Sequence, residues 1–167
     1  MNKSILILLF FVSLSYSQTI DSSSCTSIYL IRHAEKVREN VKDKNPHLNS
    51  KGLIRAEKWA SFFKNIKFDA VYSTDYFRTK ETAKSILIRN QKLVIYNPSS
   101  INYDDFIELN KGKTVLVVGH SNTVPGFANK ILNNNIYNNI EDNNNSNLYF
   151  INKCDGKVLF HALYYVN

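Results

Sequence analysis

Two arginines and two histidines in this chain have the side chains that phosphoryl chemistry needs. Arg32-His33 and Gly119-His120 each follow an apolar run directly, and Arg78 lies between the two pairs in the sequence. Arginine carries a planar, permanent charge that matches phosphate oxygens. Neutral histidine is a competent nucleophile toward phosphorus, and a second histidine can stabilise the transferring oxygens. No carboxylate cluster near these residues suits magnesium, so we expect no metal or other cofactor.

Each of these residues also has a structural interpretation. Taken singly, His33 or His120 could bond a backbone carbonyl, and Arg78 could be a solvated charge on a helix. Their joint placement at the ends of apolar runs favours the functional interpretation.

Alternating strand and helix patterns predict the elements that position these residues. Strands are predicted at 27–32, 68–73, 93–96 and 114–118, helices at 51–65, 76–89 and 124–133, helical turns at 103–110, and a hairpin at 148–160 around Asp155-Gly156. Ser50, Thr74 or Asp75, and Asn122 are the candidate helix caps. This order predicts an α/β protein, a three-layer α/β/α sandwich with a mostly parallel sheet and a C-terminal β-hairpin. In such sheets ligands bind outside the carboxyl ends of the strands. The asparagine-rich stretch 133–147 is interpreted as a surface loop without a functional role.

The first seventeen residues have the pattern of a secretory signal peptide. A basic start precedes an apolar run, and small residues lead to a predicted cleavage after Ser17. We therefore expect a secreted or periplasmic protein, with 18–26 as a flexible arm. A membrane-anchor helix is the alternative, but the apolar run is too short to span a bilayer.

Composition limits the remaining classes of protein. The chain has 167 residues, a length that indicates one folded domain, and its formal net charge is +7. The lysines are scattered, so we expect no nucleic-acid partner, and the positive charge is interpreted as attracting anionic substrates. Cys25 and Cys154 can form a disulfide if the strand at 148–152 runs antiparallel to the strand at 27–32.

Four segments occur in an order that resembles the histidine phosphatase superfamily, also called phosphoglycerate-mutase-like, in its short branch without large cap insertions. They are YLIRHAEK at 29–36, LNSKG at 48–52, DAVYSTDYFRT at 69–79 with ETA at 81–83, and VLVVGHSNTVP at 115–125. The resemblance covers about residues 27–151, and it implies that 27–167 form a histidine-phosphatase-like domain.

The resemblance implies a role for each site residue. His33 would be the nucleophile that becomes phosphohistidine, and Arg32, Arg78 and His120 would form the phosphate pocket. Members of the family usually protonate the leaving group with a carboxylate. Here Asn97 stands where short relatives often have an aspartate, so the candidate donors are Glu35 and Asp104, each of which could equally be a surface carboxylate.

These residues predict a secreted, metal-independent phosphatase that hydrolyses phosphomonoesters or phosphoramidates of small molecules. Two alternatives remain: a non-catalytic phosphate-binding module, and a phosphoglycerate-mutase-like phosphotransferase. The two histidines and two arginines argue against a binding module, while export and the lack of a cap argue against a mutase. The physiological substrate and the oligomeric state do not follow from the sequence.

Overall fold

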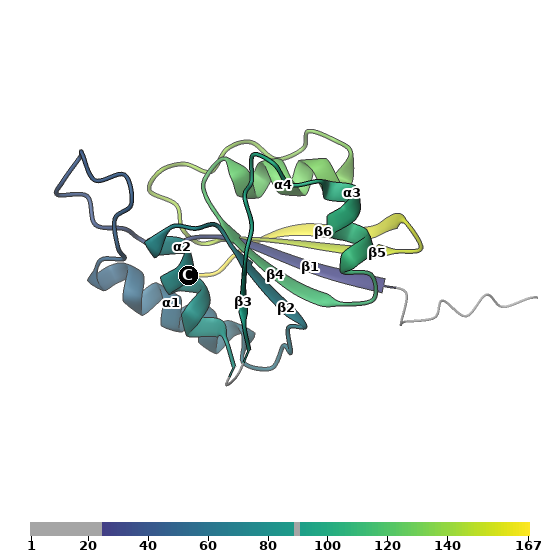
Figure 1. Ribbon diagram of the computed structural model, residues 1–167, viewed down its shortest axis with the longest axis horizontal. Helices are drawn as coiled ribbons and strands as arrows, with labels where there is room; N and C mark the ends of the chain where they lie inside the picture. The colour runs from purple at the N-terminus through teal and green to yellow at the C-terminus, as the bar shows by residue number, and fades with distance from the viewer. Residues whose placement is uncertain (1–24, 89–90) are drawn as a thin grey trace, which may run out of the picture.

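A six-stranded mixed sheet with helices on both faces forms the core of the protein in a computed structural model that describes residues 25–88 and 91–167 (Figure 1). The strands are β1 (Cys25–Arg32), β2 (Ala70–Ser73), β3 (Leu93–Ile95), β4 (Thr114–Gly119), β5 (Asn147–Cys154) and β6 (Lys157–Tyr165). The helices are α1 (Ser50–Phe63), α2 (Phe77–Ile86), α3 (Tyr103–Leu109) and α4 (Thr123–Leu132).

The sheet has the order β3-β2-β4-β1-β5-β6. The pairs β2–β3, β2–β4 and β1–β4 are parallel, whereas β1–β5 and β5–β6 are antiparallel. The α/β sandwich with a mostly parallel sheet and a C-terminal hairpin, as predicted from the sequence, is therefore confirmed. Asp155 and Gly156 both have positive φ, as the tight turn between the hairpin strands requires.

Alternating side chains of the central strands build two separate apolar layers. Val115 and Val117 of β4 pack with Phe127 of α4 in one layer. Leu116 and Val118 point to the other face, among side chains of α1 and α2. This alternation is why an uninterrupted apolar run suits a strand that is covered on both faces.

Some boundaries differ from the prediction. β1 begins at Cys25 rather than at residue 27, so Cys25 and Thr26 belong to the sheet and not to a flexible arm. α1 is capped by Asn49, whose side chain accepts a hydrogen bond from the Gly52 amide, and not by Ser50. α2 begins after Tyr76 and has no side-chain cap bond, and the candidate cap Thr74 bonds His120 instead. Asn122 lies at the N-cap position of α4, but its side chain makes no cap bond.

A disulfide joins the amino end of β1 to the carboxyl end of β5. Cys25 and Cys154 are direct partners in the antiparallel register, and their sulfur atoms are bonded. The pairing that depended on this strand direction is thereby confirmed. The predicted signal peptide, residues 1–17, lies outside the described residues. Among the helices of the described part, none is long and apolar enough to cross a membrane.

Candidate active site

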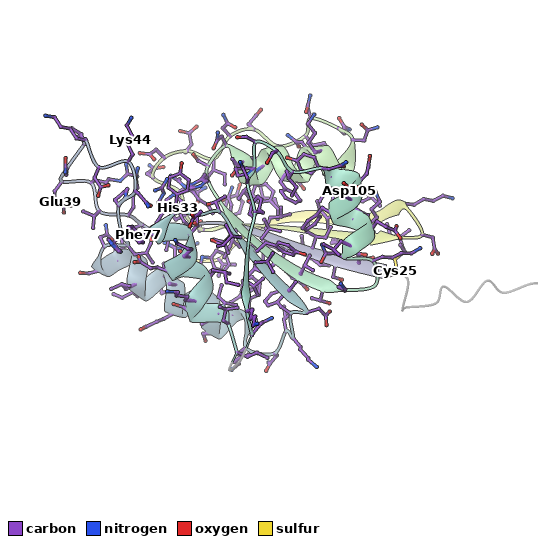
Figure 2. All side chains as sticks on the ribbon, viewed as in Figure 1. Cys25, His33, Glu39, Lys44, Phe77 and Asp105 are labelled. Carbon is purple, nitrogen blue, oxygen red and sulfur yellow. A yellow bond between two sulfur atoms is a disulfide. The ribbon has the colours of Figure 1, made fainter. Side chains whose placement is uncertain are left out.

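The carboxyl ends of β1, β2 and β4 meet at one edge of the sheet and open into a cavity of about 380 Å³. Of the residues predicted from the sequence, Arg32, His33, Arg78 and His120 all line this cavity. Its other lining residues are Lys36, Tyr76, Pro98, Ser121, Asn122, Thr123 and Asp142. Figure 2 shows His33 at this edge, with Cys25 at the opposite end of the sheet. The two histidine rings are 5.5 Å apart between centroids.

His33 is held in one tautomer by the backbone. Its Nδ1 lies 2.7 Å from the carbonyl oxygen of Ala34, and a carbonyl can only accept, so Nδ1 carries the hydrogen. Nε2 of the neutral ring therefore keeps its lone pair. Burial lowers the pKa of His33 to about 3, and the charges of Arg32 and Arg78 add to this effect. His33 is thus a neutral base at physiological pH, which is the form that a nucleophile requires.

His120 is oriented by a chain of two threonine hydroxyls. Thr79 Oγ1 donates to the carbonyl oxygens of Thr74 and Tyr76, so it accepts from Thr74 Oγ1 at 3.0 Å. Because the Thr74 hydroxyl proton is used there, Thr74 Oγ1 accepts from His120 Nε2 at 2.9 Å. The neutral ring therefore carries its hydrogen on Nε2 and has a lone pair on Nδ1. Burial and the nearby arginines lower the pKa of His120 to about 4.

Arg32 is anchored by the asparagine-rich loop that precedes β5. Its Nη1 donates to the carbonyl oxygens of Glu141, Asp142 and Asn144 at 2.8, 3.1 and 2.8 Å. Its Nη2 pairs with Asp142 Oδ1 at 3.0 Å, while Arg38 pairs with the other oxygen of the same carboxylate. The two arginines hold the pKa of Asp142 down at about 2. The stretch interpreted as a surface loop without a functional role therefore forms part of the cavity wall through Asp142.

Arg78 has few partners of its own. Its guanidinium lies over the Tyr76 ring, 4.4 Å from the centroid, and its Nη1 reaches the carbonyl of Lys44 at 3.5 Å. Within the described residues, the buried Nε atoms of Arg32 and Arg78 have no hydrogen-bond partner. Buried donors of this kind are costly unless a ligand or water accepts from them. Arg32 and Arg78 both line the cavity, so it has two cationic side chains that suit an anion.

The segment that follows β1 is fixed by residues of α1 and α2. Thr82 Oγ1 accepts from the Ala34 amide and donates to the Arg78 carbonyl, which ties the nucleophile segment to α2. On α1, a Cβ at Gly52 would lie 2.0 Å from the carbonyl oxygen of Glu35, so only glycine fits there. These contacts explain why the motifs at 48–52 and 81–83 accompany Arg32-His33.

Neither candidate proton donor lies in the cavity. Glu35 forms an ion pair with Arg55, whose Nε is 2.8 and 3.0 Å from the two carboxylate oxygens. Asp104 is exposed in the first turn of α3. The structure thus assigns Glu35 to holding α1 beside the site rather than to the cavity lining.

Sequence reasoning missed several residues of the site, among them Lys36, Asp142 and Asn145. Lys36 and Asp142 line the cavity, and the Asn145 side chain donates to the carbonyl oxygen of His33 at 2.8 Å. Lys36 could have been found from its position three residues after His33. The loop residues carry no periodic signal. In the described part of the chain, no three His, Cys, Asp or Glu residues are grouped as metal ligands would be.

Comparisons with known proteins agree with this geometry. A family model described as histidine phosphatase superfamily (branch 1) matches residues 28–99. No curated protein matches the chain.

Solved structures share the fold. A phosphoserine phosphatase variant from Entamoeba histolytica in complex with phosphoserine has a TM-score of 0.64 at 14% identity, covering 81% of this chain and 96% of its own. The protein histidine phosphatase SixA complexed with tungstate has a TM-score of 0.65 at 14% identity, and the match covers 83% of this chain and 96% of SixA. A mycobacterial glucosyl-3-phosphoglycerate phosphatase has a TM-score of 0.66 at 12% identity, and the match covers 86% of this chain and 99% of that protein. The resemblance seen in the sequence is therefore confirmed over residues 28–99, which match the histidine phosphatase superfamily, and this match supports a phosphoric monoester hydrolase.

Proposed function

We propose that this protein hydrolyses small phosphomonoesters or phosphoramidates through a phosphohistidine intermediate on His33. One observation carries the proposal: the free lone pair of His33 Nε2 shares a cavity with two arginines whose buried Nε donors have no partner among the described residues. A nucleophile and an anion site thus coincide.

The reaction has two steps. In the first, the His33 Nε2 lone pair forms a bond to phosphorus while the bond from phosphorus to the leaving group breaks, and the leaving atom takes the electron pair and then a proton from solvent water. In the second, water attacks phosphorus, the P–N bond breaks, and a proton is lost. Neutral His33 and inorganic phosphate result. Arg32 and Arg78 offset the charge on the transferring oxygens in both steps, and His120 does so when its Nδ1 takes up a proton in the presence of the phosphate.

Metal-independent catalysis is part of the proposal. The cationic side chains at the cavity can supply the charge stabilisation that a metal ion supplies elsewhere. Among the described residues, Asp142 is the only carboxylate that lines the cavity, and with a pKa of about 2 it is ionised at neutral pH. It is therefore a poor proton donor, which favours substrates whose leaving group departs easily. Phosphoramidates and aryl phosphates are of this kind.

The proposal also covers the size of the substrate and the compartment in which the protein acts. Neighbouring structures hold phosphoserine and 3-phosphoglyceric acid, which supports a small phosphorylated substrate. We also propose that residues 1–17 are a signal peptide and that the domain at 27–167 acts outside the cytoplasm. The Cys25–Cys154 disulfide supports this location, because disulfides persist in oxidising compartments.

The test measures p-nitrophenyl phosphate hydrolysis in EDTA for the wild type, His33→Ala and His161→Ala. His161, on β6, is a matched control because it hydrogen-bonds Tyr137 and does not line the cavity. We expect EDTA-resistant turnover that only His33→Ala abolishes, and a base-stable, acid-labile phosphoryl adduct on quenched wild type. Turnover that persists in His33→Ala would refute the mechanism. A protein that binds phosphate but turns over neither p-nitrophenyl phosphate nor a phosphoramidate would be a binding module.

A further inference from the structure

Lys36 lines the cavity beside Arg32, His33 and Arg78, yet the proposed mechanism does not use it. Its side chain is half-buried. In the part of the chain that the structure describes, its ammonium makes neither a hydrogen bond nor an ion pair. By contrast Lys80, on α2, pairs with Asp75 at 2.7 Å. Lys36 is therefore a cation in the lining of the cavity that pairs with no acidic side chain among the described residues.

The surroundings of Lys36 make this arrangement unfavourable without a ligand. Burial lowers the pKa of Lys36, and the like charges of Arg78, Arg38 and Arg32 lower it further, against a smaller opposing effect of Asp142. Such a cluster of like charges in a partly buried place favours binding of an anion.

The partners of the neighbouring arginines leave Lys36 available to an anion. Arg32 and Arg38 both pair with Asp142, and the charge of Asp43 acts on Arg78. Asp142 is already shared between Arg32 and Arg38, which leaves Lys36 as the cation available for a second group.

Space for such a group lies next to Lys36. A second cavity of about 230 Å³ shares Lys36 with the first and is lined also by Arg38, Asp43 and Pro46. Asp43 already accepts from the Asn45 amide. Because Lys36 lines both cavities, it is the residue that a group extending from the first cavity toward the second would meet.

We propose that Lys36, with Arg38 beside it, forms a subsite for a second anionic group on the leaving-group side of the substrate. The substrates would then be phosphorylated compounds that also carry a carboxylate or a further phosphate. This inference rests on the proposed function for the position of the transferred phosphate.

The test compares phosphoserine with phosphoethanolamine, which differ by one carboxylate. The purified protein carries Lys36→Met, which keeps the apolar stem, or Lys36→Arg, which keeps the charge. Lys58→Met, at an exposed position of α1, is the control. Binding is measured by calorimetry in the His33→Ala background, so the result does not depend on turnover. p-Nitrophenyl phosphate kinetics with His33 intact are measured in parallel.

We expect the parent protein to prefer phosphoserine about tenfold, the size of one partly exposed charge-assisted hydrogen bond. Lys36→Met should remove this preference, and Lys36→Arg and Lys58→Met should retain it. Equal binding of the two ligands by the parent protein, or an unchanged preference in Lys36→Met, overturns the subsite. A lower kcat for p-nitrophenyl phosphate in Lys36→Met at unchanged ligand preference would assign Lys36 to leaving-group chemistry and also overturn it. Failure of the proposed function is recognised separately, as wild-type protein that binds these ligands but does not turn over.

Discussion

Replacing Thr74 with valine removes one hydrogen-bonding atom from the site while keeping the shape of the side chain. Thr74 is 1% exposed, and its hydroxyl accepts from His120 Nε2 and donates to Thr79. In Thr74→Val the His120 N–H loses its acceptor, so the chain of hydroxyls no longer determines which ring nitrogen carries the hydrogen.

The expected losses follow from that one bond. A hydrogen bond to a group that becomes charged contributes about 1.5–3 kcal/mol. His120 gains positive character when it stabilises the transferring phosphate. We therefore expect kcat/KM to fall by about 10- to 150-fold, since 1.36 kcal/mol corresponds to a factor of ten. The unfolding free energy should fall by about 1–3 kcal/mol, because buried polar groups lose their partners.

Thr26→Val separates the two effects. Thr26 is also buried, at 2% exposure, and its hydroxyl also makes two hydrogen bonds, but it lies at the amino end of β1, away from the site. This control should lose similar stability and keep its kcat/KM for p-nitrophenyl phosphate. Thr74→Ser, which retains the hydroxyl, should recover most of the activity.

Nitrogen NMR of the histidine rings tests the cause directly. Wild type should show His120 as the Nε2–H form at neutral pH, and Thr74→Val should show a mixture of both tautomers. If Thr74→Val keeps its kcat/KM within twofold of wild type, or if wild-type His120 carries its hydrogen on Nδ1, the reasoning is refuted.

Three further predictions concern charge, covalent structure and pH. Asp142→Asn removes a carboxylate that is 73% exposed and that competes with phosphate for Arg32. The inhibition constant of inorganic phosphate should therefore fall about two- to fivefold, and weaker inhibition would contradict this. Replacing Cys25 and Cys154 by serine should lower the unfolding free energy by up to about 5 kcal/mol in urea titrations and leave kcat unchanged, because the disulfide lies at the other end of the sheet. His33 has a pKa of about 3 in the folded state, so the unfolded state takes up the proton first as the pH falls below about 6.5. The unfolding free energy should therefore decrease between pH 6.5 and 3, by about 2 kcal/mol at pH 5. Urea titrations at these pH values should show a smaller decrease in His33→Ala.

The strands and the four main site residues could be predicted because their signals are local. The apolar run of β4 identifies a strand that is covered on both faces, and the polar residues directly after it must lie at its carboxyl end. In a parallel sheet those ends share one edge, so His33 and His120 come together without any knowledge of loop structure.

Interactions between distant loop residues could not be predicted in this way. Arg32 bonds the carbonyls of residues 141–144, which lie more than a hundred positions away in a segment without periodicity. Thr74 shows a related error, because its position before α2 suggested a helix cap. A hydroxyl can serve either role, and only the approach of His120 in three dimensions decides between them.

The strand order places the asparagine-rich loop over the site. β1 has β4 on one side and the antiparallel β5 on the other, so the chain must enter β5 at the edge where β1 ends. Whatever its sequence, the connection from α4 to β5 therefore passes the guanidinium of Arg32 and the carbonyl of His33. Lengthening or shortening this connection would reshape the wall of the pocket while the sheet keeps the nucleophile in place. Selectivity could in this way change through loop length alone, independently of the catalytic step.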